Sequence, residues 1–509
     1  MNLTGQQLIG FSITSSSTLA FQAHSPTTGE TLPTLFYQAT ASEVEHAVSL
    51  AQKAFLTFQS IDGKKRANFL HAIAQGILDL GDALLDRYVA ETGLPSGRAE
   101  GERGRTINQI RAFAQSIEKD DWRRIQLDPA QPDRTPLPKP SLVSWENALG
   151  PVVVFGASNF PLAFSVAGGD TIAALAAGCP VLFKAHPAHP GTSEMVGRVI
   201  QQAAQEHALP EGVFSMLVDP SFATGSQLVQ HPAICAVAFT GSFRGGKALF
   251  DLAANRPKPI PVYAEMGSIN PVFLFPTTSN QENELFAQGY VDSLILGTGQ
   301  FCTNPGVLFV SKDSPVIRLI QEKITVSHGG AMLTVDIQKR YERSIKDWKK
   351  HVALLGTGQR VDPERMVLPH VFLTDWTSYS QKKNLHEEVF GPSGLIVTVQ
   401  DTSEFLEIAE HMEGQLTVSL HGTADQLASS LELIQLLQEK AGRLVFNGFP
   451  TGVEVSPAMV HGGPFPATTD SRSTSVGLNS IYRFTRPVCF QNAPMLCLPT
   501  FIQLKLQNT

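Results

Sequence analysis

The sequence of 509 residues lacks the features that mark several large classes of protein. Its five cysteines are an odd and irregularly spaced set, which favours neither a disulfide framework nor a zinc site and fits a reducing compartment. No basic stripe or block is present and the formal net charge is -7, so we expect no nucleic-acid or acidic-membrane partner. No apolar run approaches the roughly 20 residues of a membrane span, and Met1–Leu19 contains no Lys or Arg, so a cytoplasmic protein is expected.

What the chain does have is length and an alternation of apolar runs with helical segments. Apolar residues make up 42% and charged residues 17%, which is typical of large globular proteins, and the length indicates more than one domain. Apolar runs that alternate with helices predict an α/β fold with a doubly wound parallel sheet, and a second α/β run begins at residue 284. The predicted strands are 21–30, which enters a Pro/Gly turn, 151–156, 179–184, 213–218, 233–242, 262–267, 270–275, 307–310, 395–399, 416–420 and 444–447.

The remaining segments are helical or irregular. Thr40–Glu43 is a capping box that opens an amphipathic helix, and a second helix is predicted from Lys64 to Glu91. The charged cluster Arg98–Thr106 leads into a further helix and is interpreted as a solvated face. Residues 128–140 are rich in proline and indicate a connector or an exposed arm, and the tail after Asn479 indicates a returning strand or an arm.

Polar residues stand where four of the predicted strands end: Asn159, Lys184, Gly241 with Ser242, and Glu265. Ligands of open α/β sheets bind at the carboxyl ends of the strands, so these residues indicate a cofactor crevice. Gly241 and Ser242 open a helix whose N-terminal amides suit a pyrophosphate, although ordinary capping explains them equally well. Lys184 suits ribose hydroxyls or a 2′-phosphate, and is otherwise a surface lysine.

Two of these residues are also candidates for chemistry. Glu265 lies between apolar residues, where burial raises the pKa of a carboxyl group, and it is therefore a candidate general base; a structural ion pair is the alternative. Asn159 is a candidate donor to an oxyanion, or a residue that fixes a turn.

Cys302 lies in a loop of small and turn-forming residues, from Gly297 to Gly306. Glycines on both sides let the backbone approach a reacting carbon and leave the thiol little apolar cover to raise its pKa, so Cys302 is a candidate nucleophile. The alternative is a small buried hydrophobe, as free cysteines usually are.

Taken together, these motifs resemble those of the aldehyde dehydrogenase superfamily across nearly the whole chain. The matching residues are Asn-Phe-Pro at 159–161, Lys184, Phe-Thr-Gly-Ser at 239–242, Glu-Met-Gly at 265–267, Gly-Gln-Phe-Cys at 299–302 and Glu-Val-Phe-Gly-Pro at 388–392. Strings at 101–106, 184–193 and 461–469 resemble the branch that contains 2-oxoglutarate semialdehyde (2,5-dioxopentanoate) dehydrogenases and the NADP-dependent fatty aldehyde dehydrogenase of luminous bacteria.

The resemblance implies the roles of the site residues. Cys302 would attack the aldehyde carbon, Asn159 and the Cys302 amide would hold the oxyanion, and Glu265 would activate the water that hydrolyses the thioester. His461 would assist proton transfer near Cys302 or fix its loop.

The resemblance also implies a dinucleotide site. Lys184 and Glu388 would hold the two riboses, Phe390 would pack beside the nicotinamide, and Gly241 and Ser242 would lie near the pyrophosphate. Many NAD-preferring relatives have Glu three residues after the lysine, where this chain has Pro187. Without that carboxylate to repel a 2′-phosphate, NADP or NAD is expected as cofactor, with NADP slightly favoured.

For the substrate, Arg103 and Arg105 are candidates to bind a distal carboxylate, which suits a short semialdehyde acid such as 2,5-dioxopentanoate; pairing with Glu100 or Glu102 is their structural alternative. A fatty or general aldehyde remains the alternative substrate. A CoA-acylating relative, or a member of the fold without catalytic function, is the alternative class.

The family layout implies a Rossmann-like cofactor domain, an α/β catalytic domain and an oligomerisation arm. We assign residues 1–127 and 151–264 to the dinucleotide-binding domain, 265–478 to the catalytic domain, and 128–150 and 479–509 to bridging segments. A homodimer or homotetramer is expected, and no metal ion is expected.

Overall fold

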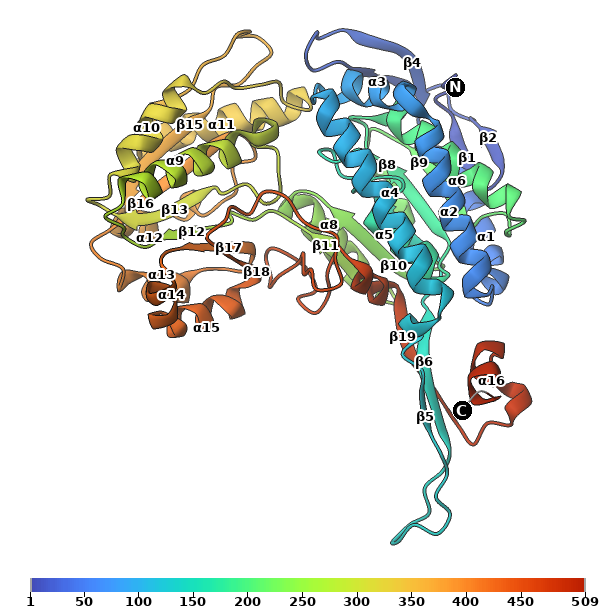
Figure 1. Cartoon of the computed structure of the whole chain (residues 1–509). Helices are drawn as coiled ribbons and strands as arrows, with labels where there is room; N and C mark the ends of the chain where they lie inside the picture. The colour runs from blue at the N-terminus through green and yellow to red at the C-terminus, as the bar shows by residue number, and fades with distance from the viewer. Residues whose placement is uncertain (1, 508–509) are drawn as a thin grey trace.

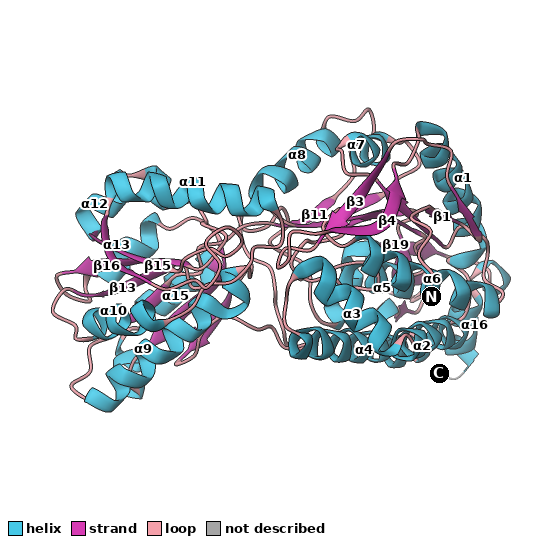
Figure 2. Ribbon diagram, turned by 90° about the horizontal axis from the view of Figure 1, so that it is seen from above, coloured by secondary structure: helices cyan, strands magenta, loops and turns pink. Residues whose placement is uncertain are grey.

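The computed structural model describes residues 2–507, which fold around two seven-stranded sheets (Figures 1 and 2). In the first sheet five strands are parallel, β1 is antiparallel to β9, and β2 is antiparallel to β1. The strands, in spatial order, are β11 (Val262–Glu265), β10 (Ala236–Thr240), β7 (Val152–Phe155), β8 (Val181–Ala185), β9 (Phe214–Val218), β1 (Gln7–Ile9) and β2 (Ser12–Thr14).

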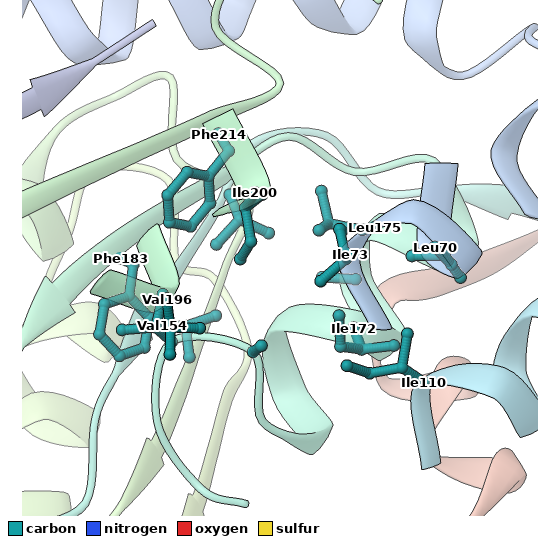
Figure 3. Packing of buried hydrophobic residues seen from close by; sticks show 14 of the residues in the cluster. Leu70, Ile73, Ile110, Val154, Ile172, Leu175, Phe183, Val196, Ile200 and Phe214 are labelled. Atoms are coloured by element: carbon teal, nitrogen blue, oxygen red, sulfur yellow. The ribbon is translucent and has the colours of Figure 1, made fainter. Parts of the chain in front are cut away.

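Alternate residues of these buried strands pack on opposite faces of the sheet. Val152 and Val154 contribute to the hydrophobic cluster that holds α2 to α6, which Figure 3 shows in part, whereas Val153 belongs to the cluster with α1, α7 and α8. Apolar residues at every position of a strand therefore follow from burial on both faces. The helices are α1 (Ala41–Phe58), α2 (Gly63–Asp79), α3 (Gly81–Thr92), α4 (Ser96–Glu118), α5 (Gly169–Ala177), α6 (Pro190–Glu206), α7 (Ala223–Gln230) and α8 (Phe243–Ala254).

The second sheet is also parallel, except that β14 is antiparallel to β15. Its spatial order is β14 (Ala353–Thr357), β15 (His370–Asp375), β16 (Ser393–Val399), β13 (Val307–Ser311), β12 (Val272–Leu274), β17 (Gln415–His421) and β18 (Ala441–Phe446). Its helices are α9 (Asn280–Ile295), α10 (Val316–Val326), α11 (Val335–His351), α12 (Trp376–Gln381), α13 (Glu404–His411), α14 (Ala424–Ser429) and α15 (Leu431–Lys440).

A three-stranded antiparallel sheet projects from the first sheet as an arm (Figure 1). Its strands are β19 (Thr485–Gln491), β6 (Leu142–Ala148) and β5 (Gln126–Asp128), and Trp145 packs with Leu498 and Ile502 of the tail. A hairpin of β3 (Ala20–His24) and β4 (Thr31–Tyr37) and the helix α16 (Thr500–Gln507) complete the regular structure apart from short 3-10 helices. Among residues 2–507, no helix has both the length and the apolar content needed to cross a membrane.

Most predicted elements are present, and the α/β fold is confirmed. The single helix expected from Lys64 to Glu91 is wrong, because the chain breaks at Gly81, which has φ 56° and separates α2 from α3. The strands β1, β2, β14 and β15 were not predicted. β1 and β2 have only three residues each, and β14 is partly exposed, so none of these three strands carries a long apolar run.

The carboxyl ends of the parallel strands of the first sheet lie side by side. Phe155 pairs with Lys184, and Thr240 pairs with Glu265, so the segments that follow β7, β8, β10 and β11 leave the sheet side by side. The loop that contains Cys302 comes from the second sheet, just before β13. The two sheets therefore contribute different parts of the candidate site.

Candidate active site

The Cys302 loop has an unusual backbone that its neighbours hold in place. Gly297, Thr298 and Gly299 have φ values of 56°, 58° and 63°, in the left-handed region that glycine tolerates best. A Cβ atom on Gly299 would lie 2.3 Å from the backbone of Gly391, so no larger residue fits there. The Asn270 side chain donates hydrogen bonds to the carbonyl oxygen of Cys302 at 2.8 Å and to that of Asn304 at 3.0 Å. The loop is fixed on both sides of the thiol.

Three side chains far apart in the sequence converge at this loop. His461 Nε2 lies 3.6 Å from Cys302 Sγ and 2.9 Å from Glu265 Oε1. Ser475 donates a short hydrogen bond to the other carboxylate oxygen of Glu265. Glu265 and His461 are buried, whereas Cys302 is partly exposed. A thiol, an imidazole and a carboxylate in contact can exchange a proton.

The electrostatics of this cluster differ from both expectations drawn from the sequence. Burial, followed by the charge of Glu265 and the hydrogen bond to it, raises the pKa of Cys302 well above its usual value, so the idea that small neighbours would leave the thiol unperturbed is wrong. Burial alone would raise the pKa of Glu265. The charge of His461, with hydrogen bonds from His461, Ser475 and Cys302, outweighs it and lowers that pKa, so the expected raised pKa is also wrong.

Asn159 lies next to the Cys302 loop. Its side-chain nitrogen donates to the carbonyl oxygen of Gln300 at 3.0 Å, and the second hydrogen of this amide leaves the group with a further donor. Asn159 is 7% exposed, so an oxygen that it binds meets little competition from water. The structure thus brings Asn159, Cys302, Glu265 and His461 into one place.

Arg98, which sequence reasoning did not select, joins the two halves of this arrangement. Its guanidinium donates to the carbonyl oxygen of Asn159 at 2.8 Å and lies over the rings of Phe160 and Phe301, 4.8 and 4.4 Å from their centroids. The two rings also contact each other edge to face. Arg98 therefore connects the oxyanion candidate to the residue before the thiol. An arginine in a charged helical stretch carries no sequence signal for this contact.

The same helix contradicts the expectation that the cluster Arg98–Thr106 is a solvated face. Glu102 is 6% exposed and accepts hydrogen bonds from the Leu162 and Ala163 amides and from the Tyr88 hydroxyl. These bonds tie α4 to the loop that carries Asn159. Leu162 and Ala163 lie 60 and 61 residues away in the sequence, and only folding shows these contacts.

The two candidate arginines for a substrate carboxylate point in different directions. Arg103 donates to the carbonyl oxygen of Gly81 at 3.1 Å. Arg105 lies over the Phe164 ring at 5.3 Å, and that ring is 6.2 Å from the His461 ring. Burial lowers the pKa of Arg105, and the charges of Glu102, Cys302 and Glu265 oppose this effect. Arg105 Nη1 is buried without a hydrogen-bond partner among the described residues, so it is available to a ligand.

Residues suited to a dinucleotide line the edge of the first sheet. Ser242 is the N-cap of α8, where its hydroxyl accepts from the Gly245 amide, and Gly241 precedes it in an exposed turn. Lys184 is 9% exposed, and its ammonium donates to the carbonyl oxygen of Asp219; burial lowers the pKa of Lys184 to about 8. A helix N-terminus and a buried lysine at one edge fit a phosphate and a ribose.

Glu388 and Phe390 lie on the other side, where they line a cavity with Ser268, Gly299 and Phe301 beside the Cys302 loop. A Cβ atom on Gly267 would lie 2.3 Å from the carboxylate of Glu388, so any larger residue there would displace that carboxylate. Burial raises the pKa of Glu388 to about 8, and the Ser268 amide opposes the shift. The carboxylate of Glu388 in the wall of this cavity is of the kind that accepts hydrogen bonds from ribose hydroxyls.

The chain is similar to known proteins over nearly its whole length. A family model described as "Aldehyde dehydrogenase family" matches residues 13–479. The chain is 47% identical to alpha-ketoglutaric semialdehyde dehydrogenase 2 of Azospirillum brasilense, covering 99% of this chain and 97% of that one, and 44% identical to the alpha-ketoglutaric semialdehyde dehydrogenase of Acinetobacter baylyi, covering 92% and 90%.

Solved structures with low sequence identity share the fold. An aldehyde dehydrogenase from Pseudomonas aeruginosa superposes with a TM-score of 0.83 at 21% identity, covering 96% of this chain and 97% of that one. A 1-pyrroline-5-carboxylate dehydrogenase from Thermus, solved with bound NAD, gives 0.82 at 22% identity, covering 96% and 92%.

The contacts of Arg98 predict a defect in turnover. In Arg98→Met the carbonyl of Asn159 loses its charged donor and the two rings lose the cation between them, so we expect the kcat for aldehyde oxidation to fall roughly 10- to 100-fold. The KM for the dinucleotide should stay within about twofold, since Arg98 lies away from Lys184 and Ser242. Arg98→Lys should recover only part of the loss, because an ammonium group cannot stack flat between two rings.

Arg124→Met is the matched control for Arg98, since Arg124 stacks on the ring of Tyr482 at 3.5 Å and is exposed. We expect wild-type turnover from it. Equal turnover in Arg98→Met and Arg124→Met would contradict the positioning role.

The charge of Glu265 predicts the reactivity of the free thiol. Glu265 raises the pKa of Cys302, so Glu265→Gln should lower that pKa and move the pH profile of Cys302 alkylation by iodoacetamide toward acid. The profile would be measured by mass spectrometry of the peptide that contains Cys302. Glu454→Gln, which neutralises an exposed carboxylate, should leave the profile in place. A profile that stays fixed or moves toward alkali in Glu265→Gln would contradict the proposed coupling.

Proposed function

This chain belongs to the aldehyde dehydrogenase family, and we propose that it oxidises 2,5-dioxopentanoate, the semialdehyde of 2-oxoglutarate, to 2-oxoglutarate with NADP or NAD. Two relatives named for this substrate are 47% and 44% identical to it over nearly the whole chain. The observation within the site that carries the proposal is the Nη1 of Arg105, which has no hydrogen-bond partner among residues 2–507 and belongs to a side chain linked through Phe164 to the catalytic cluster.

The proposed reaction begins with removal of the thiol proton. Because the pKa of Cys302 is raised, the thiol needs a base, and the neutral form of His461, with Nε2 at 3.6 Å from Sγ, is placed to accept the proton. Glu265, 2.9 Å from the same nitrogen, then stabilises the imidazolium. The thiolate attacks the aldehyde carbon and forms a thiohemiacetal.

Asn159 and the backbone amide of Cys302 are proposed to stabilise the oxyanion that this attack creates. The Arg98 contact with the Asn159 carbonyl and the Asn159 contact with Gln300 orient the amide before substrate binds. A donor that is fixed in advance costs no reorganisation during the reaction.

The residues at the two ends of the crevice fit a dinucleotide, which would accept the hydride from the substrate carbon when bound. Lys184 and Ser242 would hold its adenosine and pyrophosphate side, and Glu388 and Phe390 its nicotinamide side. Glu265 would then deprotonate the water that hydrolyses the Cys302 thioester. The lowered pKa of Glu265 keeps it ionised for this task.

This arrangement disfavours the alternatives of another class. A member of the fold without catalytic function would not need a nucleophile, an acceptor for its proton and an oxyanion donor in contact with one another. A CoA-acylating enzyme transfers the acyl group to a thiol, for which a buried carboxylate next to Cys302 is not needed. A product assay with and without CoA separates hydrolysis from transfer.

We also propose that the arm formed by β5, β6 and β19 takes part in a homodimer or homotetramer. Residues 129–138 at its tip are all exposed, and Leu137 is 69% exposed. An apolar side chain on a projecting strand pair suits contact with a second copy. We keep the domain division given above, with bridging segments at 128–150 and 479–509, as part of this proposal. We also propose a reducing, cytoplasmic setting, which suits the five free cysteines.

The substrate proposal predicts how the wild-type enzyme ranks aldehydes. In assays of cofactor reduction with aldehydes of increasing length, we expect kcat/KM to be highest for 2,5-dioxopentanoate and lower for n-alkyl aldehydes, because only the acid can bind Arg105. A preference for long alkyl aldehydes would instead favour the fatty aldehyde alternative.

A pair of variants tests the role of Arg105 within this prediction. Arg105→Met should raise the KM for 2,5-dioxopentanoate by roughly 10-fold or more, the worth of a charge-assisted hydrogen bond, and spare propanal. Arg103→Met is the control, because that guanidinium binds Gly81, and it should behave as wild type with both substrates. Equal losses on acid and neutral aldehydes in Arg105→Met would remove the basis of the substrate assignment.

The absence of a carboxylate after Lys184 predicts coenzyme choice. Pro187 stands where an acidic side chain would repel a 2′-phosphate, and the neighbouring side chains His186 and His189 are not anionic. We therefore propose that NADP is accepted and slightly preferred over NAD, measured as the ratio of kcat/KM for the two. Pro187→Glu should shift this ratio toward NAD. A hundredfold preference of the wild-type enzyme for NAD would contradict the inference.

A further inference from the structure

The catalytic cluster also presents a set of metal ligands. Cys302 Sγ, His461 Nε2 and a carboxylate oxygen of Glu265 lie within 4.8 Å of one another, and thiolate, imidazole and carboxylate are the ligands that Zn²⁺ binds in proteins. We propose that this cluster binds Zn²⁺ through Cys302, His461 and Glu265, and that the bound ion reversibly inhibits the enzyme. This proposal holds whichever aldehyde is the substrate.

The spacing of the donors fits a tetrahedral ion. Zinc bonds of about 2.3 Å to sulfur and about 2.0 Å to nitrogen place the two ligand atoms about 3.5 Å apart at a tetrahedral angle. The distance from Cys302 Sγ to His461 Nε2 is 3.6 Å. His461 Nε2 and Glu265 Oε1 are 2.9 Å apart, so they would separate by about half an ångström on binding.

The charges of the donors suit a divalent cation in a buried place. A thiolate, a carboxylate and a neutral imidazole together carry two negative charges, so a bound Zn²⁺ makes the site neutral. Glu265 and His461 are 3% and 1% exposed, and a neutral complex is the form that such burial penalises least. Binding releases the thiol proton to solvent, because only the thiolate is a ligand.

Three protein ligands leave the fourth position of a tetrahedral ion open. That is the arrangement of zinc sites that bind water or a small molecule, so the ion is held without a closed protein cage. One ion would occupy the nucleophile, its base and the carboxylate that activates water, so a single bound ion would suffice for complete inhibition.

The strength of binding also follows from the contacts. Metal-bound histidines usually donate their second ring nitrogen to an oxygen, which orients the ring. His461 Nδ1 is buried without such a partner in the described part of the chain. We therefore expect micromolar binding, which chelators reverse, and no resident zinc. The cysteine spacing gave no sign of this site, because folding alone brings its donors together.

Titration with Co²⁺ tests the proposal directly, since a cobalt–thiolate bond has a charge-transfer band in the near ultraviolet. The protein without cofactor should show this band at one Co²⁺ per chain, and added Zn²⁺ should abolish it. Cys302→Ser should remove the band, and His461→Asn should weaken Co²⁺ binding at least about tenfold. The double variant Cys489→Ser/Cys497→Ser is the matched control, because both thiols are exposed, and it should keep the band. A band that survives in Cys302→Ser, or binding that His461→Asn leaves unchanged, would overturn the proposal.

A second measurement uses only the wild-type protein, so misfolding of a variant cannot obscure it. Saturating ZnCl₂ should slow iodoacetamide alkylation of Cys302 at least about tenfold, and EDTA should restore the rate. Cys489 and Cys497 in the same sample are internal controls and should react at unchanged rates. An unchanged rate at Cys302, or equal slowing at all three, would refute a site at the catalytic cluster.

Discussion

The position of the Glu265 carboxylate next to the Cys302 thiol is the constraint on which the site depends. Two negative charges at this distance disfavour each other, so the thiol keeps its proton while the carboxylate is ionised. His461 lies in contact with both groups and gives the proton a defined place to go. Oxidation and alkylation require a thiolate, so the same arrangement that delays activation also protects the sulfur between turnovers.

The fold brings these groups together from two sheets. Glu265 ends a strand of the first sheet, and Cys302 precedes a strand of the second. Arg98, on α4, contacts residues on both sides of this junction, where it lies over Phe160 and Phe301. A guanidinium held between two rings loses little further side-chain entropy, so Arg98 can fix the relative positions of the Asn159 amide and the Cys302 thiol.

Much of the architecture could be predicted from the sequence, because parallel strands buried on both faces leave long apolar runs. Asn159, Glu265 and Cys302 could be selected because they stand in motifs at strand ends or in a glycine-rich loop. Arg98 and Glu102 could not, since their partners lie about 60 residues away and their own neighbourhood has the composition of a solvated helix. The directions of the pKa shifts could not be predicted from the sequence for the same reason, because each depends on which donors fold against the group. Short strands such as β1 and β2 carry too few residues for any periodicity to show.

The strand β19 pairs with β6, and the Thr485 hydroxyl donates to Glu146, a residue 339 positions earlier. Arg483, just before that strand, forms a buried ion pair with Asp170 of α5. On the ribosome the first sheet therefore emerges long before the segment that completes its surroundings, and Asp170 lacks its cation until residue 483 has been made. The first sheet thus lacks the cation of Asp170 and the partner of β6 until residues 483–491 have been made, so its folding depends on a segment far along the chain.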